Sequence, residues 1–110
     1  MKPSARKAKG RQLQNFVRDR LLETFPDLEK DDIKSTIMGA QGEDIQLSPA
    51  ARKLIPFNIE CKNRAAIAIY NDYKQANAHG KHNPLLVIKQ NHSKPLAVLD
   101  FDLFLALLKA

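Results

Sequence analysis

The sequence contains little cysteine and no long apolar run, and each of these absences excludes a class of protein. A single cysteine among 110 residues excludes an internal disulfide and a zinc site built on four thiolates. No apolar stretch approaches the ~20 residues of a membrane-spanning helix. The charged N-terminus lacks the apolar segment of a secretion signal. We therefore expect a protein of the reducing cytoplasm, with no membrane partner.

Basic residues are in excess, with a net charge of +6 and a pI of about 9.6. This balance favours an anionic partner, of which nucleic acid is the commonest. We expect residues 1–9 to form a flexible basic arm and residues 10–110 to form a single domain. The arm either neutralises phosphates or is a solvated terminus that aids solubility. Several basic residues precede the first acid, Asp19, among them Lys2, Arg6, Lys7, Lys9 and Arg11.

Apolar spacing and breaker residues predict an α/β fold, a mixed sheet with helices packed on it. Apolar residues at helical steps mark the covered face of two helices, with Gly80 as the stop of the second: Leu13, Phe16, Val17, Leu21 and Phe25 in the first, and Ile69, Tyr73 and Ala76 in the second. Ser48 and Pro49 begin a short turn, with proline suited to a first helical position. The expected elements are a helix over 10–25, strands over 31–38, 43–47 and 57–62, a helix over 65–78, strands over 85–88 and 96–99, and a final helix that starts at Asp100 or Asp102 and ends at 108.

Strand alternation brings chemically useful side chains onto one face. In the strand over 57–62, Glu60 and Lys62 point away from the face of Cys61. If this strand pairs with the strand over 43–47, Asp44 joins them on that face. Two close carboxylates call for a cation between them, and Mg²⁺ takes oxygen ligands such as these and the Cys61 backbone carbonyl. The plainer alternative is a surface ion pair that contributes little energy.

Asp44 followed by Glu60-Cys61-Lys62 resembles the PD-(D/E)XK nuclease motif, with Glu43 where the motif often has proline. The stretch over 38–63 is similar to small phage-encoded nucleases of that superfamily. The segment AKGRQLQ resembles the first helix of archaeal Holliday-junction resolvases, which often carry an acid where this chain has Gln14. The resemblance implies a restriction-endonuclease-like fold with an α-β-β-β-α-β core.

The resemblance also implies an activity, the Mg²⁺- or Mn²⁺-dependent hydrolysis of DNA, with branched DNA as the substrate. Asp44, Glu60 and Lys62 are then the catalytic residues. The metal ligands are Asp44, Glu60 and the Cys61 carbonyl, with Gln14 in an auxiliary position. Related resolvases act as homodimers because a junction offers two symmetric strands to cut. If the chain is phage-encoded, its location is the host cytoplasm.

The candidate DNA-binding residues are Lys9, Arg11, Arg52 and Gln75. Arg52 either grips a phosphate or is a solvated loop charge, and Gln75 is a candidate only by comparison with related nucleases. The apolar residues Leu103, Phe104 and Leu107 either pack on the sheet or form part of a dimer surface. The alternative function is a non-catalytic DNA-binding protein that retains the nuclease fold.

Overall fold

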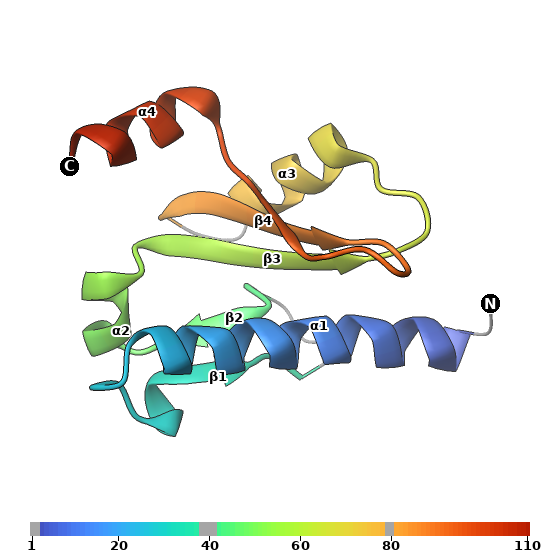
Figure 1. The fold of residues 1–110 in the computed structure, drawn as a ribbon, viewed down its shortest axis with the longest axis horizontal. Coiled ribbons are helices and arrows are strands. Elements are labelled where there is room, and N and C mark those ends of the chain that lie inside the picture. The colour runs from blue at the N-terminus through green and yellow to red at the C-terminus, as the bar shows by residue number, and fades with distance from the viewer. Residues whose placement is uncertain (1–2, 38–41, 79–80) are drawn as a thin grey trace.

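A long N-terminal helix lies alongside two small β-sheets, and a second helix covers the far side of the larger sheet (Figure 1). The computed structural model describes residues 3–37, 42–78 and 81–110. The expected α/β class, with mixed sheet pairing and flanking helices, is confirmed. The elements are α1 (Pro3–Thr24), a 3-10 turn (Lys30–Asp32), β1 (Ile33–Ser35), β2 (Ile45–Leu47), α2 (Pro49–Leu54), β3 (Phe57–Asn63), α3 (Ile69–Ala78), β4 (Asn83–Lys89), β5 (Leu96–Val98) and α4 (Phe101–Lys109).

The strands form two sheets rather than the single expected sheet. β1 pairs with β2 antiparallel, while β3 pairs with β4 in parallel and β4 pairs with β5 antiparallel. The predicted ladder between β2 and β3 is therefore wrong in the described chain. The two strands are instead joined just before β2, where the Asp44 N–H donates to the Ile59 carbonyl at 3.1 Å. Because β2 has only three residues before α2 begins, its main pairing is with β1.

The helix α1 begins at Pro3, whereas the sequence predicted a flexible arm over residues 1–9. Residues 3–9 are helical because proline is tolerated in a first turn and the alanine, lysine and arginine that follow are good helix formers. As expected, Leu13 and Val17 are buried against the core. Phe16 was expected on the same face, but it is 47% exposed.

The hydrophobic core lies between α1 and the strands and is centred on three isoleucines. Ile33 of β1 and Ile45 of β2 are fully buried, and Ile59 of β3 is 1% exposed. All three belong to one cluster with Leu13 and Val17 of α1. Full burial of such a side chain contributes roughly 1.5–3 kcal/mol. Helix α1 thus holds both sheets together through one apolar contact region.

A local hydrogen-bond network fixes the start of α2 as the Ser48–Pro49 pair predicted. The Ser48 hydroxyl accepts the Ala51 N–H at 3.1 Å, as a helix N-cap does. The same hydroxyl donates to the Asp32 carboxylate at 2.6 Å. This bond, with a second from the Glu29 N–H, lowers the pKa of Asp32 below its ordinary value. The hydrogen bond between Asp32, just before β1, and Ser48, just after β2, therefore links the two ends of this strand pair.

The helix α3 begins at Ile69, later than the predicted start at Ala65. It buries Asp72 and Ala76, whereas Ile69, which was expected on the covered face, is 42% exposed. Its expected stop, Gly80, lies outside the described residues, as does the end of the predicted first strand at Met38.

The final helix, α4, is capped by the Asp100 side chain, which accepts the Leu103 N–H at 3.1 Å. None of its residues, all of which the structure describes, is buried. The expected packing of this helix on the sheet is therefore wrong, and the helix projects from the body beyond β5 (Figure 1). No described helix is long and apolar enough to cross a membrane.

Two isoleucines close in sequence test how the core is built. Ile33→Ala should lower the free energy of unfolding by about 2–4 kcal/mol, because the side chain is fully buried. Ile37→Ala is the matched control, since that side chain is 83% exposed, and it should change stability by less than about 0.5 kcal/mol. Urea unfolding followed by circular dichroism measures both values. Equal losses for the two variants would contradict the described core.

Candidate active site

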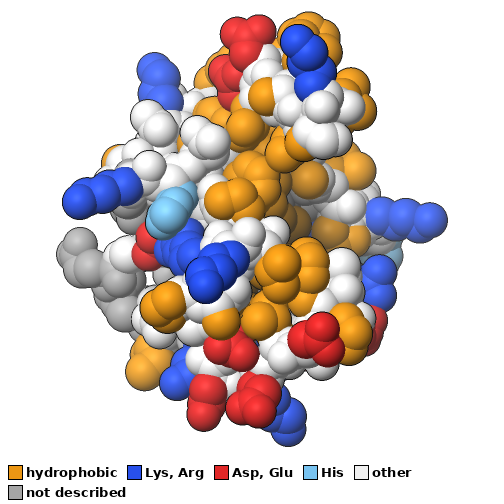
Figure 2. Space-filling model, turned by 90° about the vertical axis from the view of Figure 1, so that its left-hand side faces the viewer, with side chains coloured by type: hydrophobic (Ala, Val, Ile, Leu, Met, Phe, Trp, Pro, Cys, Tyr) orange, Lys and Arg blue, Asp and Glu red, His pale blue; other side chains and the backbone are white. Residues whose placement is uncertain are grey.

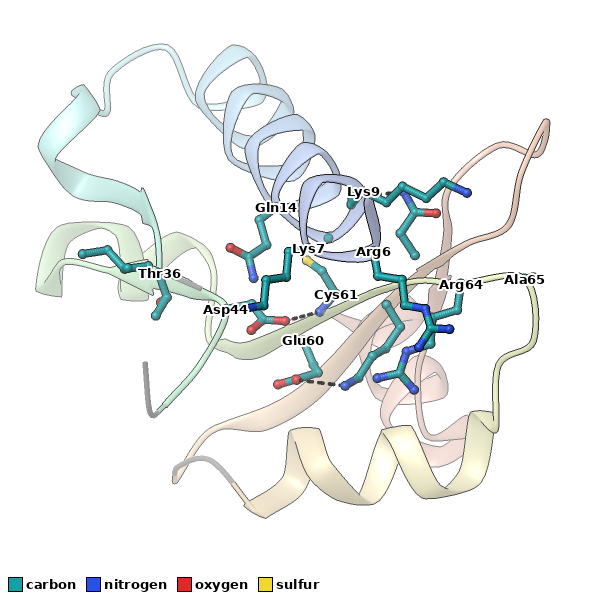
Figure 3. Close-up of a pocket in the computed structure, with 14 residues that line it drawn as sticks. Arg6, Lys7, Lys9, Gln14, Thr36, Asp44, Glu60, Cys61, Arg64 and Ala65 are labelled. Atoms are coloured by element: carbon teal, nitrogen blue, oxygen red, sulfur yellow. Dashed lines mark hydrogen bonds and ion pairs between the residues drawn. The ribbon is translucent and has the colours of Figure 1, made fainter. Parts of the chain in front are cut away.

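A cavity of about 720 Å³ lies where the first turns of α1 face the second half of β3 (Figure 3). Of the nine residues predicted for the site, it brings six together. The cavity is lined by Lys9, Gln14, Asp44, Glu60, Cys61 and Lys62, together with Arg6, Lys7, Gly10, Thr36, Ile37, Asn63, Arg64 and Ala65. Acidic, amide and basic side chains thus share one concave surface, which is typical of an active site.

The carboxylate of Asp44 is held against the backbone of β3. Its Oδ2 accepts the Cys61 N–H at 2.7 Å, and the Asp44 carbonyl accepts the Thr36 N–H at 2.8 Å. Charge-assisted hydrogen bonds of this length are among the stronger ones in proteins. Asp44 therefore reaches β3 through its own side chain and the bond to Ile59, although the expected strand ladder is missing. In the close-up view the Asp44 and Glu60 carboxylates point into the same cavity (Figure 3).

Glu60 and Lys62 form an ion pair that is almost fully enclosed. The Lys62 Nζ lies 3.7 Å from the Glu60 Oε1, and the two side chains are 13% and 8% exposed. The alternative of a solvated surface pair therefore does not describe these residues. Enclosed charges are expensive to desolvate and often lower stability, so their presence beside a cavity favours a functional role over a structural one.

Gln14 comes from the middle of α1 and reaches the same cavity. It is only 5% exposed, and its Oε1 is buried with no hydrogen-bond partner among the described residues. In the close-up view the amide nitrogen of Gln14 is turned towards Asp44 and the oxygen is turned away from it (Figure 3). A buried, unsatisfied oxygen is unfavourable unless a ligand meets it. The resemblance assigns an auxiliary position in the site to this residue.

The available donors fit a hard cation such as Mg²⁺. Asp44 and Glu60 supply carboxylate oxygens, Gln14 supplies an unsatisfied amide oxygen, and Cys61 supplies a backbone carbonyl on the same strand. Such oxygen donors are the ligands that Mg²⁺ and Mn²⁺ prefer. Nowhere in the described ranges do three or more His, Cys, Asp or Glu side chains gather into a metal-binding group. A cation here would therefore depend on neutral oxygens and water for its remaining ligands.

Cys61 contributes its backbone, not its thiol. Its side chain is 7% exposed and belongs to the hydrophobic core. Burial raises the pKa of the Cys61 thiol well above its ordinary value, and the negative charges of Asp44 and Glu60 raise it further. The thiol therefore stays protonated at neutral pH, which excludes it as a nucleophile.

Basic side chains surround the carboxylates, and some of them were not among the predicted binding residues. Arg6 and Lys7 line the cavity from α1, and Arg64 lines it from the residue after β3. Lys9, which was predicted, also lines it and donates to Asn91 at 2.6 Å. The α1 residues follow from helical spacing, because Gln14, Gly10 and Arg6 are four residues apart. These residues share a face only if the helix starts at Pro3. Since residues 1–9 were expected to form a flexible arm, Arg6 was not predicted as a residue of this face.

Arg64 is held by a buried carboxylate on α3. Its guanidinium Nη1 lies 3.8 Å from the Asp72 Oδ1, with side-chain exposures of 55% for Arg64 and 5% for Asp72. The second oxygen of Asp72, Oδ2, is buried and has no hydrogen-bond partner among the described residues. Asp72 therefore biases the position of an otherwise mobile cationic side chain at the edge of the cavity.

The other three predicted residues lie away from the cavity. Arg11 and Gln75 are exposed, on α1 and α3, and neither is among the described residues that line the cavity. Arg52 is neither a solvated charge nor a cavity residue. Its guanidinium donates to the Phe57 carbonyl at 2.6 Å and to the Glu43 carboxylate at 3.2 Å. These two bonds link the start of β3 to the residue before Asp44.

Comparison with known proteins provides no family assignment. No protein-family model matches the chain, and no curated protein or solved structure is significantly similar to it. The class of site described above therefore rests on the chain's own residues and on the local motif resemblance.

The reactivity of Cys61 tests the orientation of β3. In the folded protein at pH 8, modification of this thiol by a disulfide reagent should be at least about 100-fold slower than in denaturant, because the thiol is buried and its pKa is raised. A Tyr70→Cys change in a Cys61→Ala background is the control, since position 70 is 87% exposed and should react rapidly. Rapid labelling of native Cys61 would mean that this face of β3 is open.

Proposed function

We propose that this chain is a metal-dependent DNA endonuclease that hydrolyses phosphodiester bonds, with branched DNA such as a four-way junction as its substrate. One observation carries the proposal: Asp44, Glu60 and Lys62 line one cavity together with the basic side chains of Arg6, Lys7, Lys9 and Arg64. Phosphodiester hydrolysis needs both halves of this arrangement, acids to hold a cation and bases to hold the phosphates. The resemblance of the Asp44 and Glu60-Cys61-Lys62 motif to PD-(D/E)XK nucleases supports the same reaction.

In this proposal Asp44, Glu60 and the Cys61 carbonyl hold Mg²⁺ or Mn²⁺, and the amide oxygen of Gln14 serves as an auxiliary neutral ligand. The bond from the Cys61 N–H keeps the Asp44 carboxylate in place before any cation arrives. A bound divalent ion would polarise the scissile phosphate and acidify the attacking water. Because an amide stands where related enzymes often have an acid, we expect the auxiliary position to bind its cation weakly.

Lys62 is the residue that we assign to the attacking water. Its ammonium is held near Glu60 and is only 13% exposed, so it acts in a setting with little competing solvent. From there it positions the water by hydrogen bonding and offsets the negative charge that develops on the phosphate. The charge offset is stronger in an enclosed site than it would be at the surface.

In this proposal the basic side chains of the cavity bind the DNA backbone beside the cleaved bond. Arg6, Lys7 and Lys9 approach from α1, and Arg64 approaches from beyond β3. Guanidinium groups bind phosphate oxygens in pairs, so Arg6 and Arg64 are the stronger contacts. In the close-up view both arginines extend to the same side of the cavity (Figure 3). Asp72 acts through Arg64 and is therefore a positioning residue.

The resemblance further supports a homodimer as the active form, since a four-way junction presents two symmetric strands. It also supports a cytoplasmic location, in the host cell if the chain is phage-encoded. The competing proposal is a DNA-binding protein without catalysis. It is favoured by the amide of Gln14 at the auxiliary position and by the lack of a third acidic ligand among the described residues.

Cleavage of supercoiled plasmid and of a four-way junction tests the proposed reaction. With Mg²⁺ or Mn²⁺ the protein should cut at least one of them, and EDTA should stop the reaction. Asp44→Asn, Glu60→Gln and Lys62→Ala should each lower the rate by at least about 100-fold, because each removes a metal ligand or the group at the water. Asp27→Asn is the matched control, since it alters an exposed acid outside the cavity.

DNA binding, measured in EDTA or Ca²⁺, separates the two proposals. If the protein binds but no metal supports cutting, the non-catalytic alternative replaces the nuclease. If it neither binds nor cuts, both proposals fail. Retention of cutting in all three site variants would also overturn the assignment of this cavity.

The Arg64–Asp72 pair allows a separate test of the basic rim. Arg64→Ala should weaken DNA binding several-fold and reduce the salt slope by about one counterion. Asp72→Asn removes a negative charge, so charge alone predicts tighter binding, whereas loss of positioning predicts weaker binding. We expect weaker binding, and no effect of Asp72→Asn once Arg64 is alanine. Arg20→Ala is the control for a lost arginine, because that side chain is 62% exposed and does not line the cavity. Tighter binding by the Asp72 variant would contradict the positioning role.

A further inference from the structure

The last helix of the chain, α4, is apolar on most of its circumference and is only partly covered by the body of the protein. Phe101 is 70% exposed, Phe104 is 45% exposed and Leu108 is 67% exposed. None of the nine residues of α4 is buried. In the side view, in which α4 lies at the top, hydrophobic side chains continue from this helix down the middle of the molecule (Figure 2).

Such a helix is unstable by itself. A helix of nine residues is too short to form alone in water, and most helix stability in proteins comes from packing of an apolar face. A helix that is apolar on nearly all sides is normally buried. A contiguous exposed apolar surface of this kind marks a contact site. The body of the protein covers α4 only near Leu103, which is half-buried and lines a small surface pocket with Tyr73 and Pro84.

The charges of α4 indicate what kind of surface covers it. Only Asp102 and Lys109 are charged, so the helix carries one acid and one base. Helices that lie on membranes carry several lysines or arginines on the polar face, which attract anionic lipid. The balanced pair on α4 does not fit that pattern. The pair of charges fits a protein surface that carries one basic and one acidic residue with the same spacing as Asp102 and Lys109.

The helix itself has this complementary arrangement. Phe101, Leu105 and Leu108 follow one another at steps of three and four residues and form an apolar seam along the helix. Asp102 and Lys109 lie two helical turns apart on the same flank of that seam. When two copies of α4 pack antiparallel about a two-fold axis, Phe101 meets Leu108 of the partner subunit. Asp102 then lies beside Lys109 of the partner subunit, and the reciprocal pair forms at the other end.

We propose that α4 is the self-association surface of this protein, with a second copy packed antiparallel against the seam and with two reciprocal ion pairs between Asp102 and Lys109. The inference comes from the exposure, apolar pattern and charge of α4, and it does not depend on the endonuclease proposal. A nine-residue helix pair buries less than the ~1,200 Å² of a stable interface. The dimer is therefore weak, with a dissociation constant of roughly 10–100 μM.

Sedimentation equilibrium of the whole chain over a range of concentrations tests the surface. Wild type should move from monomer to dimer as concentration rises, and Leu108→Glu should remain monomeric. Tyr70→Glu is the matched control, because Tyr70 is also an exposed apolar residue but lies on α3, and it should dimerise as wild type does. Since α4 contributes no buried residue to the core, the Leu108 variant should keep the wild-type unfolding midpoint.

Charge exchange tests the antiparallel register. Asp102→Lys and Lys109→Asp should each weaken the homodimer by about tenfold, because each creates two like-charge pairs. An equimolar mixture of the two variants should recover wild-type affinity as a heterodimer, in which both pairs are again opposite in sign. This recovery also controls for any damage to the helix, since damage would persist in the mixture.

Three results would overturn the proposal. The first is a wild-type protein that stays monomeric at every concentration. The second is a mixture of the charge variants that associates no better than either variant alone. The third is a monomer that instead binds anionic lipid vesicles through α4, which would assign the apolar seam to a membrane.

Discussion

The Asp44 carboxylate accepts the Cys61 N–H at 2.7 Å, and the candidate active site depends on this hydrogen bond. β2 pairs with β1 and not with β3, and near Asp44 the two sheets meet through the Asp44 side chain and a backbone hydrogen bond to Ile59. A hydrogen bond to a charged group contributes about 1.5–3 kcal/mol, more than an ordinary backbone bond. The same bond that joins the sheets also sets the carboxylate beside Glu60.

The two faces of β3 carry different kinds of side chain: apolar residues of the core on one face and charged residues of the candidate site on the other. One face presents Ile59 and Cys61 to the core, where α1 covers them. The other face presents Glu60 and Lys62, an ion pair whose side chains are 8% and 13% exposed. Enclosed charges of this kind usually reduce stability. That the protein keeps them next to a cavity is the physical reason to assign the site to this face rather than to the better-packed one.

The basic surroundings of the site come from parts of the chain that are far apart in sequence. Arg6 reaches it from the first helix, and Arg64 reaches it from beyond β3 under the influence of Asp72 on α3. Acidic and basic side chains from these distant segments therefore line one cavity. In the proposed function the acids hold the cation and the bases hold the polyanion.

The motif residues were predictable because their relation is local. Alternation along a strand places Glu60 and Lys62 on one face whatever the sheet contains, and helical periodicity similarly identified Leu13 and Val17 as buried. The roles of Arg52 and Asp72 were not predictable. Arg52 binds the Phe57 carbonyl and Glu43, and Asp72 is buried on α3 and paired with Arg64, a residue of another element.

The amino-acid sequence thus determined the α/β class, the order of the elements, the Ser48 helix cap and the faces of β3, because each depends on neighbours a few residues apart. Tertiary structure alone decided that β2 and β3 lie in separate sheets. It also decided that the first turns of α1 complete the cavity and that α4 stays uncovered. These features depend on which surfaces meet in space, and residue spacing carries no information about distant contacts of that kind.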